Sequence, residues 1–262
     1  MNKRHWCSLI LGALSPQTYA QPQPPASVLK AAARTEIWEP QPRIVTPAAT
    51  HGAAPSDAIV LFDADNLDQW CSTNDLSKPA PWIVEDGIFT VKKGTGNIQT
   101  KQSFADYQLH IEWRTPADIQ GEGQERGNSG IFLASTGKGD EGYEIQILDN
   151  YNNKTYSNGQ AASVYKQTPP LINAGKPPGE WQTYDIVWTA PRFNENGKLI
   201  SPARVTLLFN GILVQNNTEV KGVTRWIGGP SYKAHGAAPI KLQDHNDPSK
   251  PISFRNIWLR VL

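Results

Sequence analysis

Three hydrogen-bonding side chains lie along one short apolar stretch, residues 142–149, which reads GYEIQILD. Because the side chains of a strand alternate between its two faces, Glu144 and Gln146 share one face and the isoleucines point to the other. Asp149 would fall on the apolar face of a regular strand, but one extra residue before it, a β-bulge, would return it to the face of Glu144. A carboxylate and an amide on one strand face can exchange a proton with a substrate and bind its hydroxyl groups.

This spacing resembles the Glu-x-Asp-x-x-Glu bulge motif of retaining jelly-roll glucanases, with Gln146 at the position of the central acid and Asp149 at that of the last. A glutamine side chain cannot ionise, so the pattern is present with different charges. A half-buried strand with an ordinary polar outer face would produce the same triplet, and this alternative stays open.

A second group of polar side chains comes near the end of the chain, in the block LQDHNDP. Gln243 and His245 would share one strand face, and residues 246–248 predict a turn at the end of that strand. A histidine at such a position can donate to a ketone, shuttle a proton or bind a metal ion, or serve as a structural hydrogen-bonding group. Glu144, Asp149 and His245 are therefore candidate ligands of a divalent metal ion.

Residues 107–114, YQLHIEWR, alternate between apolar and polar side chains and place His110 and Glu112 on one face. If this strand neighbours that of Glu144 on a concave sheet, His110 and Glu112 converge on the same cleft and bind substrate. A surface of cross-strand ion pairs is the alternative. Arg255, in the block SFRN, could hold a sugar hydroxyl or a carboxylate, or form an ordinary ion pair.

Three further side chains are candidates for sugar binding. Asn128 precedes the strand IFLA and could bind a hydroxyl group, although an Asn beside Ser-Gly also suits a turn. Lys166 ends the block ASVYK. Trp226 lies in the glycine-rich stretch RWIGGPSYKAHG, where loops at the edge of a sheet commonly carry binding residues, and it could stack on a sugar ring.

Short alternating segments separated by turns run from Ala58 to the end of the chain. Asp86-Gly87 and Asn210-Gly211, each between apolar segments, predict β-hairpins. No segment of ten or more residues carries a helical stripe, so the pattern predicts an all-β fold, an antiparallel β-sandwich or barrel. An antiparallel sandwich buries one face of each sheet, and the other face is solvated or lines a groove.

The chain is predicted to have three parts: a signal peptide at residues 1–20, a Pro/Ala-rich linker or tail at 21–56 and a β-sandwich domain at 57–262. The apolar run near the start is too short to be a permanent membrane span. Removing the signal peptide leaves Cys71 as the one cysteine, so no internal disulfide can form. A periplasmic or secreted location is expected.

The charge balance excludes some partners. The chain carries 25 basic and 24 acidic residues, a formal charge of +1. Loss of Lys3 and Arg4 with the signal peptide, which contains no acidic residue, leaves 23 against 24. This near-neutral balance offers no basic field for a nucleic acid or an anionic membrane.

The order of several uncommon blocks, among them GNSGIFL, YEIQILD and PIKLQDHNDPSKPISFRNIWLR, resembles the 3-keto-disaccharide hydrolase domain family over about Ile59 to Leu262. The resemblance implies a concanavalin A-like jelly roll, common in exported bacterial proteins. It also implies a small carbohydrate substrate, a glycoside whose glucose unit is oxidised at carbon 3.

Such a substrate allows an elimination mechanism, because a 3-keto group acidifies the proton on carbon 2. The reaction needs a base, a donor for the enolate oxygen and an acid for the leaving group, and water then adds to the enone. It does not need the closely spaced carboxylate pair of a conventional retaining glycosidase. Glu144 is the candidate base, Gln146 a substrate-orienting amide and Asp149 a hydrogen-bonding or metal-binding partner. A non-catalytic lectin-like module and a conventional glycoside hydrolase are the alternatives.

Overall fold

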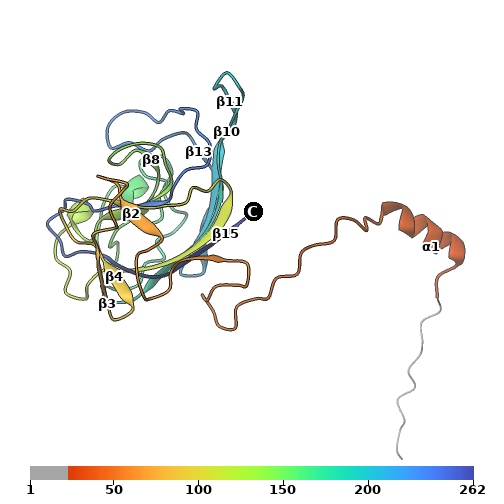
Figure 1. Ribbon diagram of the computed structural model, residues 1–262, viewed down its shortest axis with the longest axis horizontal. Coiled ribbons are helices and arrows are strands. Elements are labelled where there is room, and N and C mark those ends of the chain that lie inside the picture. Colours follow the sequence, from red (N-terminus) through yellow and green to blue (C-terminus); the bar gives the residue numbers. More distant parts are fainter. Residues whose placement is uncertain (1–22) are drawn as a thin grey trace, which may run out of the picture. The chain divides into compact units, whose positions relative to one another are not determined.

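Antiparallel strands dominate residues 23–262, the part of the chain described by the computed structural model (Figure 1). The predicted signal peptide lies outside these residues. The chain divides into two compact units between Ile44 and Val45. The described part of the first contains the helix α1 (Ala26–Ala32) and the 3₁₀ turn η1 (Ala33–Thr35), neither of which buries a residue. No helix within residues 23–262 has the length and apolar character needed to cross a membrane.

The second unit, Val45–Leu262, contains two main antiparallel sheets. The larger sheet has, in spatial order, β13 (Ile212–Val220), β12 (Ala203–Phe209), β9 (Gln182–Thr189), β6 (Tyr107–Arg114), β15 (Ser253–Val261), β4 (Ile88–Thr90) and β3 (Ile83–Glu85), and β1 (Ile59–Phe62) also pairs with β15. The smaller sheet has β2 (Trp70–Ser72), β5 (Ile98–Thr100), β14 (Lys241–Leu242), β7 (Ser129–Ser135) and β8 (Gly142–Ile147). A separate ribbon pairs β10 (Arg192–Phe193) with β11 (Leu199–Ser201), and two 3₁₀ turns are η2 (Gly123–Glu125) and η3 (Ser157–Gly159).

The core lies between these two sheets and is made by the alternation of the strands. Ile111 and Trp113 of β6 pack inward from the larger sheet, and Ile145 and Ile147 of β8 do so from the smaller one. Each side chain is at most 2 % exposed, and burying one of this size stabilises the fold by about 1.5 to 3 kcal/mol. The predicted antiparallel β-sandwich, a concanavalin A-like jelly roll, is confirmed.

Two hairpins form where the turn dipeptides predicted them. Asp86 and Gly87, with φ of 50° and 74°, join β3 to β4. Asn210 and Gly211, with φ of 53° and 79°, join β12 to β13. Positive φ at both central residues matches the twist of the flanking strands, and Asn, Asp and Gly adopt it at the lowest cost.

The outer face of the smaller sheet is buried as well. Lys241 of β14 pairs with Phe132 of β7, which in turn pairs with Glu144 of β8. Directly paired residues point to the same side of a sheet, so these three form a row on the face that points away from the core. All three are nearly or fully buried, so loops must cover this face.

Candidate active site

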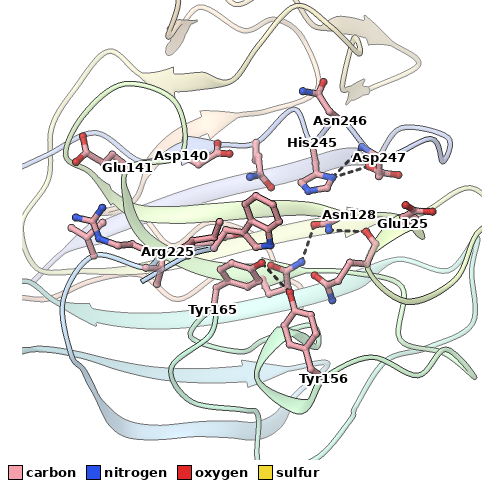
Figure 2. A pocket seen from close by; sticks show the side chains of 18 of the residues that line it. Glu125, Asn128, Asp140, Glu141, Tyr156, Tyr165, Arg225, His245, Asn246 and Asp247 are labelled. Carbon is pink, nitrogen blue, oxygen red and sulfur yellow. Dashed lines mark hydrogen bonds and ion pairs between the residues drawn. The ribbon is translucent and has the colours of Figure 1, made fainter. Parts of the chain in front are cut away.

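A cavity of about 740 Å³ lies over the outer face of the smaller sheet, and its volume suits a small carbohydrate. Its wall brings together six of the side chains predicted from the sequence: Asn128, Glu144, Gln146, Trp226, Gln243 and His245. The remaining lining comes mainly from loops, as Figure 2 shows, and consists of Gln124, Glu125, Lys138, Asp140, Glu141, Tyr156, Tyr165, Val223, Thr224, Arg225, Ile227, Asn246, Asp247 and Pro248.

Glu144 is the buried acid of this cavity. Its side chain crosses Gly130 of the neighbouring strand, where a Cβ atom would lie 2.5 Å from Glu144 Oε1, so only glycine leaves room for it. No group within residues 23–262 donates a hydrogen bond to its carboxylate, although its backbone N–H donates to Thr224 Oγ1 at 3.1 Å. Burial, and then the negative charge of Asp140, raise the pKa of Glu144 to about 8, while Lys241 opposes the shift. Glu144 is therefore an uncommitted acid whose pKa is suited to proton transfer near neutral pH.

Gln146 and Asn128 form a fixed chain of amides on the cavity wall. Gln146 Nε2 donates to Asn128 Oδ1 at 2.8 Å and to the Ile147 carbonyl at 3.2 Å, and Asn128 Nδ2 donates to the Gln124 carbonyl at 2.8 Å. Both amide hydrogens of Gln146 are thus used within the protein. Its Oε1 is the atom left to accept a hydrogen bond from a substrate hydroxyl.

Gln243 lines the same cavity, and its side-chain oxygen is buried. It continues β14, where its backbone N–H donates to the Gly130 carbonyl at 3.0 Å. The side chain is 5 % exposed, and within the described residues its Oε1 has no hydrogen-bond partner. A buried acceptor without a partner costs about 1 to 3 kcal/mol.

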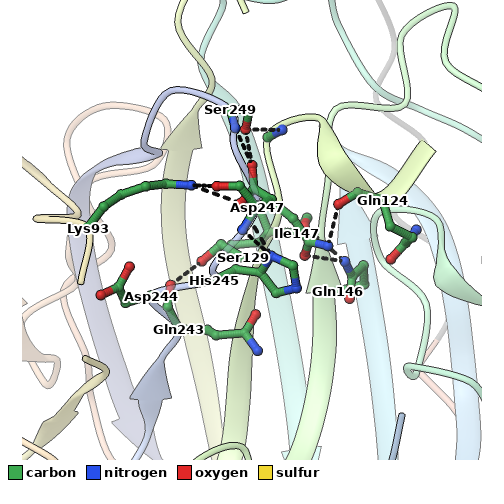
Figure 3. A network of polar contacts seen from close by, with 12 residues as sticks. Lys93, Gln124, Ser129, Gln146, Ile147, Gln243, Asp244, His245, Asp247 and Ser249 are labelled. Atoms are coloured by element: carbon green, nitrogen blue, oxygen red, sulfur yellow. Dashed lines mark hydrogen bonds and ion pairs between the residues drawn. The ribbon is translucent and has the colours of Figure 1, made fainter. Parts of the chain in front are cut away.

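His245 is oriented by Asp247, as the contacts in Figure 3 show. The backbone N–H of Asp247 lies 3.1 Å from His245 Nδ1, and Asp247 Oδ2 lies 3.3 Å from the same atom, so both contacts orient the ring and its Nε2 has no partner within residues 23–262. The Asp247 carboxylate is held in turn by Lys93 Nζ at 3.0 Å and by Ser249. Burial raises the pKa of Asp247, but the hydrogen bonds from His245, Ser249 and Lys93 outweigh it and lower the pKa overall. His245 therefore lines the cavity with its Nε2 available for a hydrogen bond to a substrate.

Trp226 lies at the mouth of the cavity and is 72 % exposed, as expected for a residue that stacks on a sugar ring. Lys166 is beside the cavity and does not line it. Its Nζ donates to the Trp226 carbonyl at 2.9 Å and lies 5.3 Å from the centre of the Tyr156 ring. Lys166 thus anchors the loop of Trp226.

The predicted convergence of His110, Glu112 and Arg255 on this cavity is wrong. The three lie on the outer face of the larger sheet, because β6 pairs with β9 and β15 and not with β8. His110 Nδ1 lies 2.7 Å from Asp185 Oδ1, and Arg255 Nε donates to Glu112 Oε2 at 2.7 Å. The group is the ion-pair network that was the alternative interpretation.

The charges of that network support one another. Burial lowers the pKa of His110, but the adjacent carboxylates of Asp185 and Glu112 outweigh it and raise the pKa to about 9. Burial raises the pKa of Glu112, whereas hydrogen bonds from His110, Asn256 and Arg255 lower it to about 2. These pKa values favour a charged structural cluster at neutral pH.

The predicted place of Asp149 beside Glu144 is also wrong. The strand alternation does break after β8, since Ile147 and Leu148 are both in the core, as the expected bulge requires. The Asp149 carboxylate, however, accepts from Arg126 Nε at 2.8 Å and from the Tyr151 N–H at 3.0 Å, and it does not line the cavity. Glu144, Asp149 and His245 do not form a common metal site, and across residues 23–262 no three His, Cys, Asp or Glu side chains group to hold an ion.

Sequence reasoning missed several residues of the wall. Tyr156 and Tyr165, whose hydroxyl oxygens are 2.9 Å apart, line one side. Asp140 and Arg225 reach the cavity from loops. Only the position of Asp140, in the turn between two alternating strands that carry site residues, offered a signal in the sequence.

Comparisons with known proteins identify the family of the chain. Residues 57–260 match the model of a 3-keto-alpha-glucoside-1,2-lyase-like domain. A protein of Bacteroides thetaiotaomicron named 3-keto-disaccharide hydrolase is 27% identical over 244 residues, which span 78% of each chain. A crystal structure of a candidate glycosyl hydrolase from Parabacteroides distasonis is 50% identical, with a TM-score of 0.82 over 95% of this chain and 100% of its own. A second such structure from that organism, 20% identical with a TM-score of 0.56 over 79% of this chain and 94% of its own, supports the fold alone.

The family match covers more than half of the chain and includes all six predicted residues of the cavity wall. The chain therefore belongs to the 3-keto-alpha-glucoside-1,2-lyase-like domain family, and the resemblance inferred from its sequence blocks is confirmed.

Proposed function

We propose that this protein cleaves 3-keto-glucosides by removing the proton on carbon 2, eliminating the group on carbon 1 and adding water to the resulting enone. The observation that carries the proposal is Glu144, a buried carboxylic acid without a hydrogen-bonding partner in the described residues, at the base of a sugar-sized cavity. The name of the Bacteroides thetaiotaomicron relative supports the same substrate class.

The first step is proton transfer to Glu144. The ketone at carbon 3 acidifies the proton on carbon 2, and the ionised form of Glu144 accepts it. With a pKa of about 8, roughly a tenth of Glu144 is ionised at pH 7, so the rate should rise with pH up to about 8. A general base of this kind contributes on the order of 10² to 10⁴ in rate.

Other polar groups of the cavity suit the enolate that forms. His245 can donate its Nε2 proton to the carbon-3 oxygen, where negative charge develops. Gln146 presents a carbonyl oxygen that can accept from sugar hydroxyls and orient the ring, and Gln243 lines the same cavity. The enolate then restores the ketone, forms the double bond between carbons 1 and 2 and releases the oxygen on carbon 1.

A lectin-like module is the second candidate, since the exposed Trp226 and the free Gln146 acceptor would also serve binding without catalysis. A conventional glycoside hydrolase is disfavoured, because Gln146 occupies the position of the central acid and cannot ionise. We also propose that the protein is periplasmic or secreted, on the basis of the signal peptide pattern in residues 1–20.

The test is incubation of the purified protein with 4-nitrophenyl 3-keto-α-glucoside, with 3-keto-trehalose and with their unoxidised parents in deuterated water. We expect turnover of the keto substrates alone, with deuterium at carbon 2 of the product. Saturable binding without turnover would support the lectin-like module, and turnover of the unoxidised parents would support a conventional hydrolase. Either result would overturn the proposal.

A further inference from the structure

Two tyrosines of the cavity have no role in the proposed reaction so far, although their hydroxyl groups are joined. Tyr156 and Tyr165 both line the cavity, and their hydroxyl oxygens lie 2.9 Å apart. Tyr156 is 39 % exposed, so one end of the pair reaches solvent. Figure 2 shows the pair on the side of the cavity away from His245 and Asp247.

The backbone places this pair beside Glu144. Val164 forms a β-bridge with Ile145, and the backbone N–H of Tyr165 donates to the Glu144 carbonyl at 3.1 Å. The segment that carries Tyr165 therefore continues the smaller sheet past β8. Tyr156 lies directly over Gly159, where a Cβ atom would come within 2.0 Å of its ring, so glycine is needed for this ring position.

Both hydroxyl groups keep their protons at neutral pH. Burial raises the pKa of Tyr165, and the neighbouring hydroxyl of Tyr156 and the charge of Glu144 raise it further. Burial also raises the pKa of Tyr156. A protonated phenol is a hydrogen-bond donor and a proton source for any stronger base.

The proposed elimination still lacks an acid for the leaving oxygen. His245 is on the other side of the cavity with its Nδ1 held by Asp247, so it suits the ketone oxygen. We propose that Tyr165 is the acid that protonates the oxygen departing from carbon 1, and that Tyr156 relays a replacement proton to it from solvent. This inference rests on the proposed function.

The protons balance over one turnover. Glu144 takes the proton of carbon 2, the bond between carbon 1 and its oxygen breaks, and the double bond between carbons 1 and 2 forms. Tyr165 gives its proton to the leaving oxygen, so a free alcohol departs, and Tyr156 passes a proton to the Tyr165 phenolate. Tyr156 then takes a proton from solvent and Glu144 releases its proton to solvent, so all three groups return to their starting states. The departing oxygen becomes more basic as its bond to carbon 1 breaks, so it accepts the proton of Tyr165 during this step.

The test compares leaving groups that differ in their need for a proton. 3-Keto-trehalose releases a basic sugar alkoxide, whereas 4-nitrophenolate departs without protonation. For Tyr165→Phe we expect kcat to fall on the order of 100-fold with 3-keto-trehalose and by less than about fivefold with 4-nitrophenyl 3-keto-α-glucoside. Tyr156→Phe should show the same selectivity between substrates with a smaller loss, about tenfold in kcat with 3-keto-trehalose. In this variant water can still reprotonate Tyr165, but more slowly than Tyr156 does.

Tyr151→Phe is the matched control for Tyr156→Phe, because both tyrosines are 39 % exposed and Tyr151 does not line the cavity. It should leave both rates unchanged. Equal losses with both substrates in Tyr165→Phe would indicate a structural or binding role and overturn the inference, as would no loss with either. If the unmodified protein turns over neither keto substrate, the proposed function itself fails and this inference falls with it.

A second measurement needs no variant and covers the case in which Tyr165→Phe does not fold. Across a series of aryl 3-keto-glucosides, the wild-type rate should depend weakly on the basicity of the departing phenol, because an acid assists its departure. A steep dependence, as expected for unassisted departure, would overturn the inference.

Discussion

Glu144→Gln should make the protein more stable at alkaline pH while removing its activity. At alkaline pH the Glu144 carboxyl ionises freely in the unfolded chain, whereas in the folded protein its ionisation is opposed by burial. This difference lowers the free energy of unfolding of the wild type. The amide has nearly the same shape and carries no titratable proton. The free energy of unfolding of Glu144→Gln therefore does not fall with pH through ionisation of this side chain.

The size of the effect follows from the pKa of Glu144, about 8 in the folded protein against a usual 4.5. Because the folded-state pKa is raised, the stabilising contribution is complete below pH 4.5 and is lost as the pH rises to about 8. Each pH unit within this window removes about 1.4 kcal/mol from the free energy of unfolding. Between pH 5 and pH 8 the loss is about 4 kcal/mol, an upper value because water entering the cavity reduces the cost of burial.

The assay is urea unfolding of the wild type and of Glu144→Gln at pH 5, 6, 7 and 8. Other titrating groups are common to both proteins, so the difference between their unfolding free energies isolates Glu144. We expect this difference to change in favour of the variant by about 2 to 4 kcal/mol from pH 5 to pH 8. In the same preparations, turnover of 4-nitrophenyl 3-keto-α-glucoside should fall on the order of 100-fold or more.

Glu141→Gln is the control, since Glu141 lines the same cavity but its side chain is exposed. Its unfolding free energy should follow that of the wild type at every pH. A difference between wild type and Glu144→Gln that stays within about 0.5 kcal/mol across the range would show that burial does not hold this carboxyl protonated, and the reasoning would be refuted.

Three further outcomes are expected. Asp140→Asn removes a negative charge that raises the pKa of Glu144, so the rising limb of kcat/KM against pH should move to lower pH by up to about one unit; an unmoved limb contradicts this. Trp226→Ala should raise KM for the keto substrates about fivefold through lost stacking, with Tm unchanged because the side chain is exposed; an unchanged KM contradicts the assignment. Glu112→Gln should lower the unfolding free energy by roughly 1 to 3 kcal/mol at pH 7. The effect should shrink as the pH falls from 4.5 toward the folded-state pKa of about 2, because the wild type loses this stabilisation there. The values of kcat and KM should not change, and altered kinetics would show that Glu112 belongs to the active site.

The strands, their buried faces and the hairpin turns were readable from the sequence. A two-residue period decides which side chains of a strand share a face, and Asp-Gly or Asn-Gly pairs decide where two strands turn. These rules correctly placed Glu144 with Gln146 on the cavity-facing side of β8; Gln243 and His245 also line the cavity, but β14 ends at Leu242, before both of them. The family resemblance likewise depended on local blocks of residues.

The sheet to which each strand belongs was decided only by the tertiary structure. The polar face of β6 looked equivalent to that of β8, yet long-range pairing put Glu112 in the larger sheet and Glu144 in the smaller one. Asp149 forms an ion pair with Arg126, which is 23 residues away in the chain, and no alternation pattern predicts such a pair. Tyr156 and Tyr165 are only nine residues apart, but their contact depends on the path of the irregular segment between them, which no alternation pattern reports.

The chemistry of Glu144 likewise depends partly on local sequence and partly on tertiary packing. Its residue type and strand face are local properties, and they are encoded in eight consecutive residues. Its raised pKa comes from burial beneath loops and from the charge of Asp140, and both depend on how separate parts of the chain pack. The sequence by itself determined which groups could carry a proton and on which strand face they lie. Tertiary packing decided which of them share a cavity, because periodicity acts between neighbouring residues, whereas sheet pairing and desolvation act between segments far apart in the chain.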